Sequence, residues 1–458
     1  MTNNKSLKIA YVGGGSMGWA RVFMTDLALE PNLGGEIRLY DINMEAAKRN
    51  EIIGNTITSD ERSVGKWKYI VAPTLSEALT GADFVVISIL PGTFEHMRSD
   101  VHMPERLGIY QSVGDTVGPG GILRALRTVP EYVKFADAIR DYCPEAWVIN
   151  YTNPMSQCIR TLYHVFPQIK AFGCCHEVFG TQQLLAAMYE KETGERPKRS
   201  EIKVDIIGLN HFTWFTSATY KEQDLTDLFA RYSKQYYDTG FSNDDSKMPD
   251  ICFTCTNRVK FDLFLRKGFI AAAGDRHLAE FMPGDIYLKD PETVESWGFY
   301  LTHVDWRIKD RANKIEQTRR LAGGEETVTL SPSGEEGILL IKALCGLETV
   351  TSNVNLPVKP KQNSALPLET IIETNAVFSK DSVVPVTDKK MNIPTALEDL
   401  IMPHVENQAL IFKAAYEYDR EAVYEAFERE PLIKGKCSQQ ELKALADDMM
   451  LKCGEGGI

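Results

Sequence analysis

The chain has 458 residues, of which 43% are hydrophobic and 25% charged, a composition typical of a folded globular protein with room for two domains. Its 51 basic and 63 acidic side chains give a formal net charge of −12, which argues against a nucleic acid or an anionic membrane as partner. We find neither a signal-sequence pattern nor an apolar run of membrane-spanning length. The nine cysteines, an odd number, are scattered and suggest no disulfide framework, so we expect a reducing, cytoplasmic location.

The N-terminal residues carry a dinucleotide-binding pattern. Residues 7–12 predict a strand and residues 19–29 a helix, and between them lies a G-x-G-x-x-G pattern. In such a turn Gly13 makes the sharp bend, Gly15 lets backbone amides approach a pyrophosphate, and Gly18 allows the helix to pack closely. Strand, glycine turn and helix in this order predict a Rossmann-type nucleotide site.

The next strand adds the residue that selects the nucleotide. Residues 36–40 predict this strand, which ends in Asp41. A carboxylate at this position can accept both hydroxyls of the adenosine ribose and would repel a 2′-phosphate. The pattern therefore predicts NAD, rather than NADP, as the cofactor.

Strands and helices continue to alternate through the first two hundred residues. Further strands are predicted at residues 68–72, 84–89, 146–151, 169–173 and 204–209. Helices are predicted between them, at residues 93–107 and 123–142. This alternation predicts an α/β fold with a doubly wound parallel sheet, which we assign to a domain of residues 1–200.

Beyond residue 200 the pattern changes to that of an α+β domain, residues 201–458. Helices are predicted at residues 225–238, 299–321, 337–347, 403–429 and 438–453. Alternating apolar residues predict antiparallel strands at residues 348–358 and 366–386. We expect the two domains to face each other across a crevice that holds the substrate.

Candidate metal ligands follow two predicted strands. Cys175 and His176 come after the strand at residues 169–173, and His211 follows the strand at residues 204–209. Thiolate and imidazole suit a transition metal, and strand ends that face a crevice are where open α/β sheets place their chemistry. The alternative is that the adjacent cysteines are inert packing, as buried cysteines commonly are.

Three more motifs are candidates for the crevice. They are the glycine-rich loop at residues 114–121 with Asp115, Asn153 before Pro154 at the expected first helical position, and Asp275 after a stretch of small residues. Each has a structural alternative: a helix entry for the loop, an N-cap for Asn153 and a solvated charge for Asp275.

Taken together, these motifs resemble family 4 of the glycoside hydrolases, the NAD- and divalent-metal-dependent glycosidases. The resemblance spans most of the chain and rests on the glycine turn, the loop at residues 114–121, Asn153-Pro154-Met155, Cys175-His176-Glu177-Val178 and Gly208-Leu209-Asn210-His211. It implies a fold like that of lactate and malate dehydrogenases, an active site between the domains, and a homodimer or homotetramer.

The resemblance also implies roles for single residues. Cys175 and His211 match the ligands of Mn²⁺. Asn153 matches a residue that contacts nicotinamide and sugar hydroxyls, and Asp115 matches an acidic residue near the same hydroxyls. His176 matches the position of the acid that protonates the leaving oxygen.

Asp275 is the match for the catalytic base, at a position where many relatives use tyrosine. The implied mechanism oxidises the sugar at C3 with NAD, removes the C2 proton, eliminates the glycosidic oxygen, adds water and reduces C3 again. NAD is therefore regenerated in each turnover.

Cys175-His176-Glu177-Val178 resembles the α-galacturonidase branch, whereas the loop at residues 114–121 and the residues after it resemble α-galactosidases; an α-glucuronidase is a further alternative. A uronate needs a cationic partner, for which the candidates are Arg98, Arg124, Arg127 and Arg276.

Outside the family, the alternatives are a 2-hydroxy-acid dehydrogenase, a non-catalytic NAD-sensing protein, and a structural zinc site at Cys252 and Cys255.

Overall fold

The computed structural model describes residues 5–242, 253–359, 366–387, 392–452 and 454. Its first six strands are β1 (Lys5–Val12), β2 (Leu33–Tyr40), β3 (Lys66–Val71), β4 (Phe84–Ile87), β5 (Trp147–Asn150) and β6 (Lys170–Gly173). They pair in parallel in the order β3-β2-β1-β4-β5-β6. This is the doubly wound order of dinucleotide-binding domains, so the predicted Rossmann-type sheet is confirmed.

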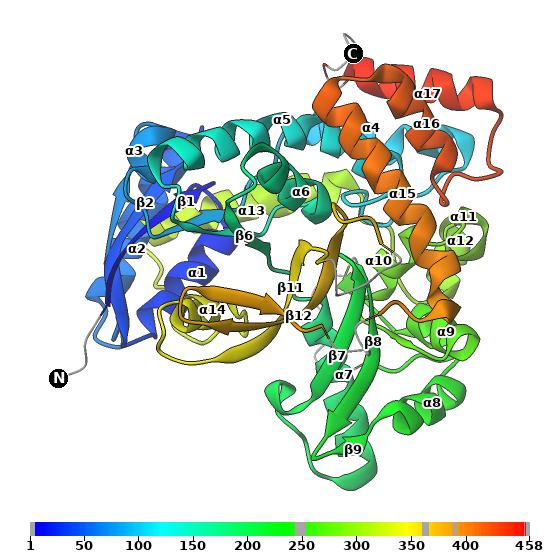
Figure 1. The fold of residues 1–458 in the computed structure, drawn as a ribbon, viewed down its shortest axis with the longest axis horizontal. Coiled ribbons are helices and arrows are strands. Elements are labelled where there is room, and N and C mark those ends of the chain that lie inside the picture. Colours follow the sequence, from blue (N-terminus) through cyan, green and yellow to red (C-terminus); the bar gives the residue numbers. More distant parts are fainter. Residues whose placement is uncertain (1–4, 243–252, 360–365, 388–391, 453, 455–458) are drawn as a thin grey trace.

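The same sheet continues into an antiparallel half. It consists of β7 (Lys203–Leu209), β8 (Phe212–Tyr220), β9 (Gln223–Asp224), β10 (Ile270–Ala271), β11 (Val350–Pro357), β12 (Ile371–Ser379) and β13 (Ser382–Pro385). β11 joins β6 where Asn355 pairs with Gly173, and β12 and β7 follow, so that one sheet crosses the molecule (Figure 1). The residues just after β6 and β7 thereby come to the middle of the structure.

Helices cover both faces of the sheet. The first seven are α1 (Trp19–Ala28), α2 (Met44–Ser59), α3 (Leu75–Leu79), α4 (Phe94–His102), α5 (Gly118–Tyr142), α6 (Met155–Val165) and α7 (Glu177–Thr193). They are followed by α8 (Thr226–Gln235), α9 (Arg258–Lys267), α10 (Asp275–Glu280), α11 (Gly284–Tyr287), α12 (Pro291–Ser296), α13 (Val304–Ala322) and α14 (Gly337–Leu344). The last three are α15 (Thr395–Glu417), α16 (Arg420–Arg429) and α17 (Gln439–Lys452).

The single helix predicted at residues 403–429 is wrong in two respects. α15 begins earlier, at Thr395, and Pro403 lies inside it rather than at its start. The chain then turns at Tyr418, whose φ is 57°, and the side chain of Asp419 accepts a hydrogen bond from the backbone N–H of Ala422 to begin α16. A left-handed residue followed by an N-cap interrupts the helical hydrogen bonds, which apolar periodicity alone does not reveal.

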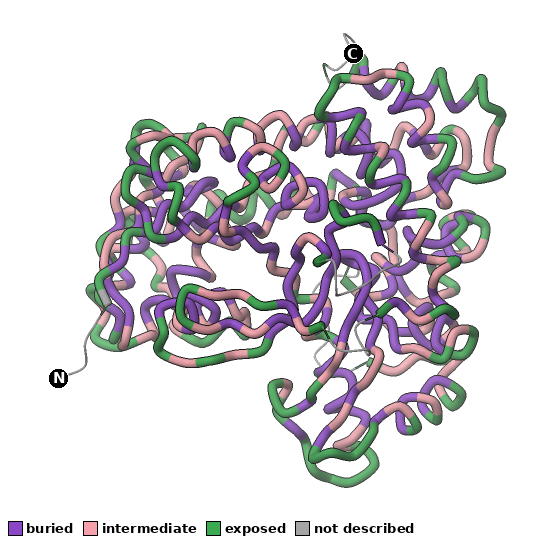
Figure 2. Tube along the Cα trace, in the orientation of Figure 1, coloured by how far each residue is buried: buried purple, intermediate pink, exposed green. Residues whose placement is uncertain are grey.

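The core explains the apolar stretches of the parallel strands. In β1, Leu7, Ile9 and Tyr11 face one hydrophobic cluster, whereas Ala10 and Val12 face another on the opposite side of the sheet. Burial is accordingly continuous from Ile9 to Val12 and along β4, in the middle of the sheet (Figure 2).

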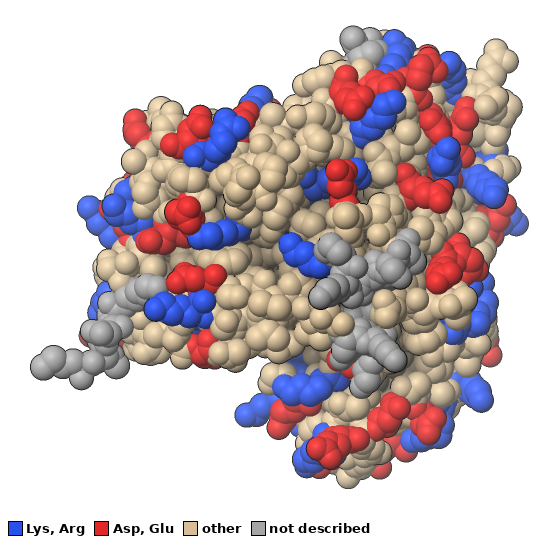
Figure 3. All heavy atoms as spheres, in the orientation of Figure 1, with Lys and Arg blue, Asp and Glu red and all other residues tan. Residues whose placement is uncertain are grey.

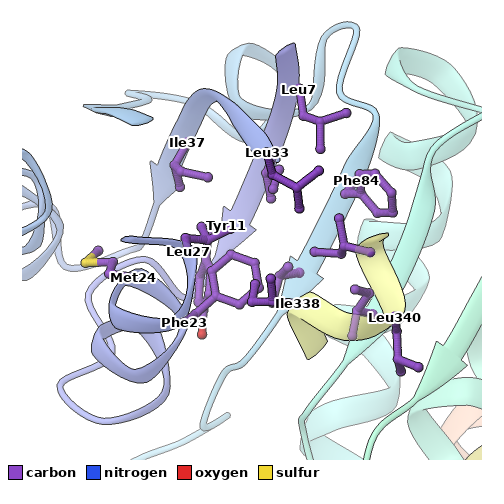
Figure 4. Packing of buried hydrophobic residues seen from close by; sticks show 14 of the residues in the cluster. Leu7, Tyr11, Phe23, Met24, Leu27, Leu33, Ile37, Phe84, Ile338 and Leu340 are labelled. Atoms are coloured by element: carbon purple, nitrogen blue, oxygen red, sulfur yellow. The ribbon is translucent and has the colours of Figure 1, made fainter. Parts of the chain in front are cut away.

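Part of this core comes from the C-terminal half of the chain. Ile338 and Leu340 of α14 pack beside Tyr11 and Phe23 of the nucleotide-binding half (Figure 4). The two halves therefore share a core, and a domain boundary at residue 200 stays a prediction.

The surface carries interspersed acidic and basic side chains on the face that Figure 3 shows. None of the helices in the described part of the chain combines the length and the apolar character needed to cross a membrane.

Candidate functional site

The glycine turn after β1 has the geometry that a nucleotide-binding turn requires. The N–H groups of Gly13 and Gly14 donate to the carbonyl of Tyr40 at 2.9 and 2.8 Å. Gly13 has a φ of +94°, and a Cβ there would lie 2.0 Å from the carbonyl oxygen of Ser88. Only glycine can occupy this position, which confirms the predicted sharp bend.

Asp41 closes the turn from the end of β2. Its Oδ2 accepts a hydrogen bond from the N–H of Gly15 at 2.9 Å, and its Oδ1 accepts one from Asn43 at 2.8 Å. The next residue, Ile42, is 95% exposed. A fixed carboxylate beside an uncovered apolar side chain suits the ribose and the flat base of an adenosine.

The role expected for Gly18 is wrong. Gly18 is the N-cap of α1, and a Cβ added there would meet no described atom within 4 Å. Close approach occurs at Gly14 instead, where a Cβ would lie 2.7 Å from the Cβ of Leu39. The consecutive glycines at positions 13–15, rather than Gly18, allow the turn to lie in close contact with β2.

Three side chains from distant parts of the chain meet in the middle of the molecule. Among the described residues, Asp115, His211 and His277 place one potential ligand atom each within 4.8 Å of the others. Asp115 precedes α5, His211 lies in the turn between β7 and β8, and His277 lies in α10. His211 has a φ of 65°, a conformation that a non-glycine residue adopts at a cost and that is common at functional sites.

Thr116 orients this group of three, which we call the triad. Its hydroxyl donates to Oδ1 of Asp115 at 2.7 Å and lies 2.9 Å from Nδ1 of His211. Since its one proton goes to Asp115, the hydroxyl accepts from Nδ1–H of His211, and Nε2 of His211 keeps its lone pair. The Nδ2 amide of Asn153 donates to the other oxygen of Asp115 at 3.4 Å.

The charges of the triad suit a cation. Burial favours the neutral acid of Asp115, but nearby positive charge, that of Arg124 first, holds the pKa of Asp115 well below the usual value. Burial lowers the pKa of His277 to about 3, helped by His211, whose ring centroid is 3.9 Å away. Burial also lowers the pKa of His211. An ionised carboxylate and two neutral imidazoles are the protonation states in which these groups bind metals.

Glu177, the first residue of α7, connects the triad to the end of β6. One of its oxygens accepts from the N–H of Gly274 at 2.8 Å, and the other lies 3.7 Å from Nε2 of His277. Burial opposes its ionisation, whereas the histidines around it, when protonated, and the N–H of Gly274 lower the pKa of Glu177. The sequence analysis assigned no role to Glu177 or His277, although both lie beside residues that it singled out.

Cys175 lies outside the triad as defined by those distances. Its carbonyl accepts a hydrogen bond from Nδ2 of Asn353 at 3.0 Å. Burial of the thiol raises its pKa well above the ordinary value, and the negative charges of Glu373 and Glu177 add to this. Its assignment as a metal ligand stays a prediction, because a ligand thiol has to lose its proton.

His176 is the exposed member of the motif. Its ring stacks on Trp19 with centroids 5.6 Å apart, and its Nδ1 lies 3.3 Å from a carboxylate oxygen of Glu335. The hydrogen bond to Glu335 raises the pKa of His176. Trp19, Tyr151 and Glu335 also line a small open hollow beside α1.

Asp275 is fully buried at the start of α10, so the alternative of a solvated charge is wrong. Its Oδ1 accepts from the backbone N–H of Lys260 at 3.1 Å, and its Oδ2 has no hydrogen-bond partner in the described residues. Burial raises its pKa to about 6. The carboxyl group thus supports the first turn of α9 and keeps one oxygen uncommitted.

Two other sequence expectations have structural outcomes. Pro154 is the N-cap of α6 rather than its first residue, so Asn153 lies one position before the cap and is not the cap itself. The zinc alternative involves Cys252, which lies outside the described residues, so the structure says nothing of that pair.

Comparison with known proteins gives the relationships of the chain. The profile described as "Family 4 glycosyl hydrolase" matches residues 8–191, and that of its C-terminal domain matches residues 206–433. The α-galacturonidase of Lachnoclostridium phytofermentans is 57% identical over 97% of this chain and 95% of its own length.

Solved structures agree with this. A Bacillus subtilis protein, 47% identical, covers 97% of this chain and 99% of its own with a TM-score of 0.91. A 6-phospho-α-glucosidase from gut microorganisms, solved with NAD and Mn²⁺, has 19% identity and a TM-score of 0.81 over 98% of both chains, a likeness of fold. A malate dehydrogenase of Cryptosporidium parvum shares the fold more distantly, at a TM-score of 0.52 and 13% identity over 90% of this chain and all of its own. With both of its parts matched and a close relative aligned along nearly its whole length, this chain belongs to family 4 of the glycosyl hydrolases.

Proposed function

We propose that this enzyme hydrolyses α-galacturonides with the help of NAD and a divalent cation, and that this cation is Mn²⁺. The observation that carries the proposal is the 57% identity to an α-galacturonidase over nearly the whole chain. Three further α-galacturonidases are 48–52% identical over 97% of the chain, whereas the α-galactosidase of Bacillus subtilis is 26% identical.

NAD fits the turn between β1 and α1. The N–H groups of Gly13 and Gly15 are bonded to Tyr40 and Asp41, so the glycines would shape the turn and the N-terminus of α1, with Gly18 at its N-cap, would face the pyrophosphate. Asp41 would hold the ribose, and the exposed Ile42 would lie against the adenine. The carbonyl of Ser88 excludes a side chain at position 13.

A divalent cation fits the triad by the chemistry of its donors. Carboxylate and imidazole are ligands that Mn²⁺ accepts, and Asp115, His211 and His277 are held in the required protonation states. His211 belongs to this set and to the pair implied by the family resemblance. Cys175 would be a further ligand only if its thiol is deprotonated on binding.

The remaining residues divide the proton transfers. When bound, NAD supplies a reversible oxidation of the sugar and the cation supplies Lewis-acid polarisation. Asp275, with a pKa of about 6 and one uncommitted oxygen, acts as the base that accepts a proton from the sugar. His176, whose pKa is raised by Glu335, donates a proton to the leaving oxygen. Asn153 and Asp115 bind hydroxyl groups of the same sugar.

A hydrolysis assay with four aryl α-glycosides tests this proposal. Galacturonide, glucuronide, galactoside and 6-phosphoglucoside are each tested with NAD, Mn²⁺ and reductant together, and with each of these left out. We expect galacturonide cleavage only in the complete mixture, without accumulation of NADH. Undiminished cleavage without NAD would refute the redox mechanism, and NADH formed in proportion to substrate would indicate a dehydrogenase.

We also propose that the enzyme works in the cytoplasm as a homodimer or homotetramer. A reducing compartment protects the Cys175 thiol from oxidation. Light scattering of the NAD-loaded enzyme tests the assembly, and a monomer at micromolar concentration would contradict it.

A further inference from the structure

Among the described residues, one arginine near the triad has no counter-ion. Arg307 lies in the first turn of α13, and its Nε is enclosed without a hydrogen-bond partner. The residue as a whole is partly buried, and its guanidinium forms no ion pair with any residue that the structure describes. Because a partly buried cation without an anion is costly, such a group in a ligand-binding region indicates an anionic ligand.

The start of α13 is joined to the loop that carries Asp115. The N–H of Thr302 donates to the carbonyl of Ser112 at 3.2 Å, and the Ser112 hydroxyl donates to the carbonyl of Arg276 at 2.5 Å. Hydrogen bonds therefore connect the segment before Arg307 to the loop of Asp115 and to α10, which carries His277. Burial lowers its pKa, and the charge of Asp115 raises it in part.

Two of the four arginines that the sequence offered as partners of a uronate carboxylate form ion pairs with other residues. Arg98 forms an ion pair with Asp305 at 2.6 Å, and Arg127 forms one with the buried Asp100. Arg127 cannot turn to a substrate without leaving the buried carboxylate of Asp100 unpaired, whereas Arg98 forms its ion pair at the surface.

Arg124 and Arg276, whose charges act on Arg307, make contacts of their own. Nε of Arg124 donates to the carbonyl of Asn153 at 3.2 Å, and its positive charge helps to keep Asp115 ionised. Arg276 lies over the ring of Phe253, 5.0 Å from its centroid. Among the described residues, the side chain of Arg307 makes neither a hydrogen bond nor a contact of this kind with an aromatic ring.

A uronide brings a carboxylate into a region that already holds two acidic side chains, Asp115 in the triad and Glu177, which lies 3.7 Å from His277. A further negative charge needs a cation with free donors, and the guanidinium fork matches a carboxylate with two parallel hydrogen bonds.

We propose that Arg307 binds the C6 carboxylate of the sugar and thereby selects uronides over neutral glycosides. This inference rests on the proposed function and names the residue that determines its substrate class. A neutral galactoside would leave the enclosed Nε of Arg307 unpaired, which is how a polar site rejects a substrate that lacks the matching group.

The test compares Arg307→Met with Arg311→Met, a change one helical turn later at an exposed arginine over the ring of Phe94. Each NAD- and Mn²⁺-loaded enzyme is assayed on aryl α-galacturonide and aryl α-galactoside. Arg307→Met should lower kcat/KM for the galacturonide at least ~100-fold, mainly through KM, because the carboxylate loses its partner. Galactoside hydrolysis and NAD affinity should stay within about threefold, and Arg311→Met should leave all three within about threefold.

Arg307→Lys keeps the charge but loses the fork, and a loss of about tenfold on the galacturonide is expected. If Arg307→Met does not fold, as judged by circular dichroism, a fully active Arg307→Lys would overturn the proposal. Unchanged galacturonide kinetics in Arg307→Met, or an equal loss on both substrates, would do so as well.

Calorimetry with free galacturonate and free galactose separates this inference from the proposed function. Galacturonate should bind wild type more tightly than Arg307→Met, and equal affinities would refute the role of Arg307 even in an enzyme that cleaves no galacturonide. A wild-type enzyme inactive on galacturonides would refute the proposed function alone.

Discussion

Replacing Asp275 with asparagine separates its two roles, because the amide keeps the shape of the side chain and removes its charge. In the folded protein burial raises the pKa of Asp275 from 3.8 to about 6. Holding the carboxylate ionised above that pH therefore costs ~3 kcal/mol relative to the unfolded chain. A pKa raised on folding stabilises the protein fully at low pH, and the stabilisation is lost as pH rises through about 6.

The expected result is a pH-dependent difference in the free energy of unfolding. Between about pH 5 and pH 8 the wild type should lose ~1.4 kcal/mol relative to Asp275→Asn, as the remaining protonated fraction disappears. Any cost from the amide group itself does not change with pH and cancels in this comparison. Urea unfolding followed by tryptophan fluorescence measures the difference at both pH values.

Activity provides the second measurement. As a base, Asp275 should contribute at least ~100-fold to kcat, so Asp275→Asn should be folded and nearly inactive on the galacturonide. A constant stability difference between the two pH values would refute the buried ionisation. A kcat within about threefold of wild type would leave Asp275 only as the residue that supports α9.

Two further pairs of variants test the cofactor sites. Gly13→Ala should weaken NAD binding at least ~10-fold, because a φ of +94° and a contact of 2.0 Å with Ser88 exclude a Cβ, whereas Gly18→Ala, with open space around it, should bind NAD normally in a fluorescence titration. Similar affinities in both would contradict the geometry of the turn. His277→Ala should lower Mn²⁺ affinity by ~100-fold in calorimetry, since it removes a ligand of the triad. If Cys175→Ser bound Mn²⁺ more weakly while His277→Ala kept its full Mn²⁺ affinity, the cation would lie at the thiolate instead.

Much of the nucleotide-binding half could be predicted from sequence because its signals are local. The apolar runs at β1 to β6 and the glycine turn depend on the alternation of strands and helices and on one backbone conformation, that of Gly13. Asp41 follows in the same way, since its distance from the turn is set by one strand–helix–strand unit. These features do not require any contact between distant parts of the chain.

The ligand set and the charges at the site were decided by the tertiary structure. Asp115 and His277 are 162 residues apart, and they meet because the loop before α5 is bonded to α10, where Glu280 accepts from the N–H groups of Val113 and Gly114. Whether an arginine is engaged, as Arg127 is with Asp100, or lacks a partner, as Arg307 does among the described residues, depends on packing across helices.

Composition and periodicity thus determined which residues form the sheet and where a nucleotide can bind, since both depend on neighbours in sequence. The protonation states of the triad depend on burial and on charges that come from other elements. Only the folded chain supplies these, which is why the burial of Asp275 and the meeting of His277 with Asp115 and His211 could not be predicted from the sequence.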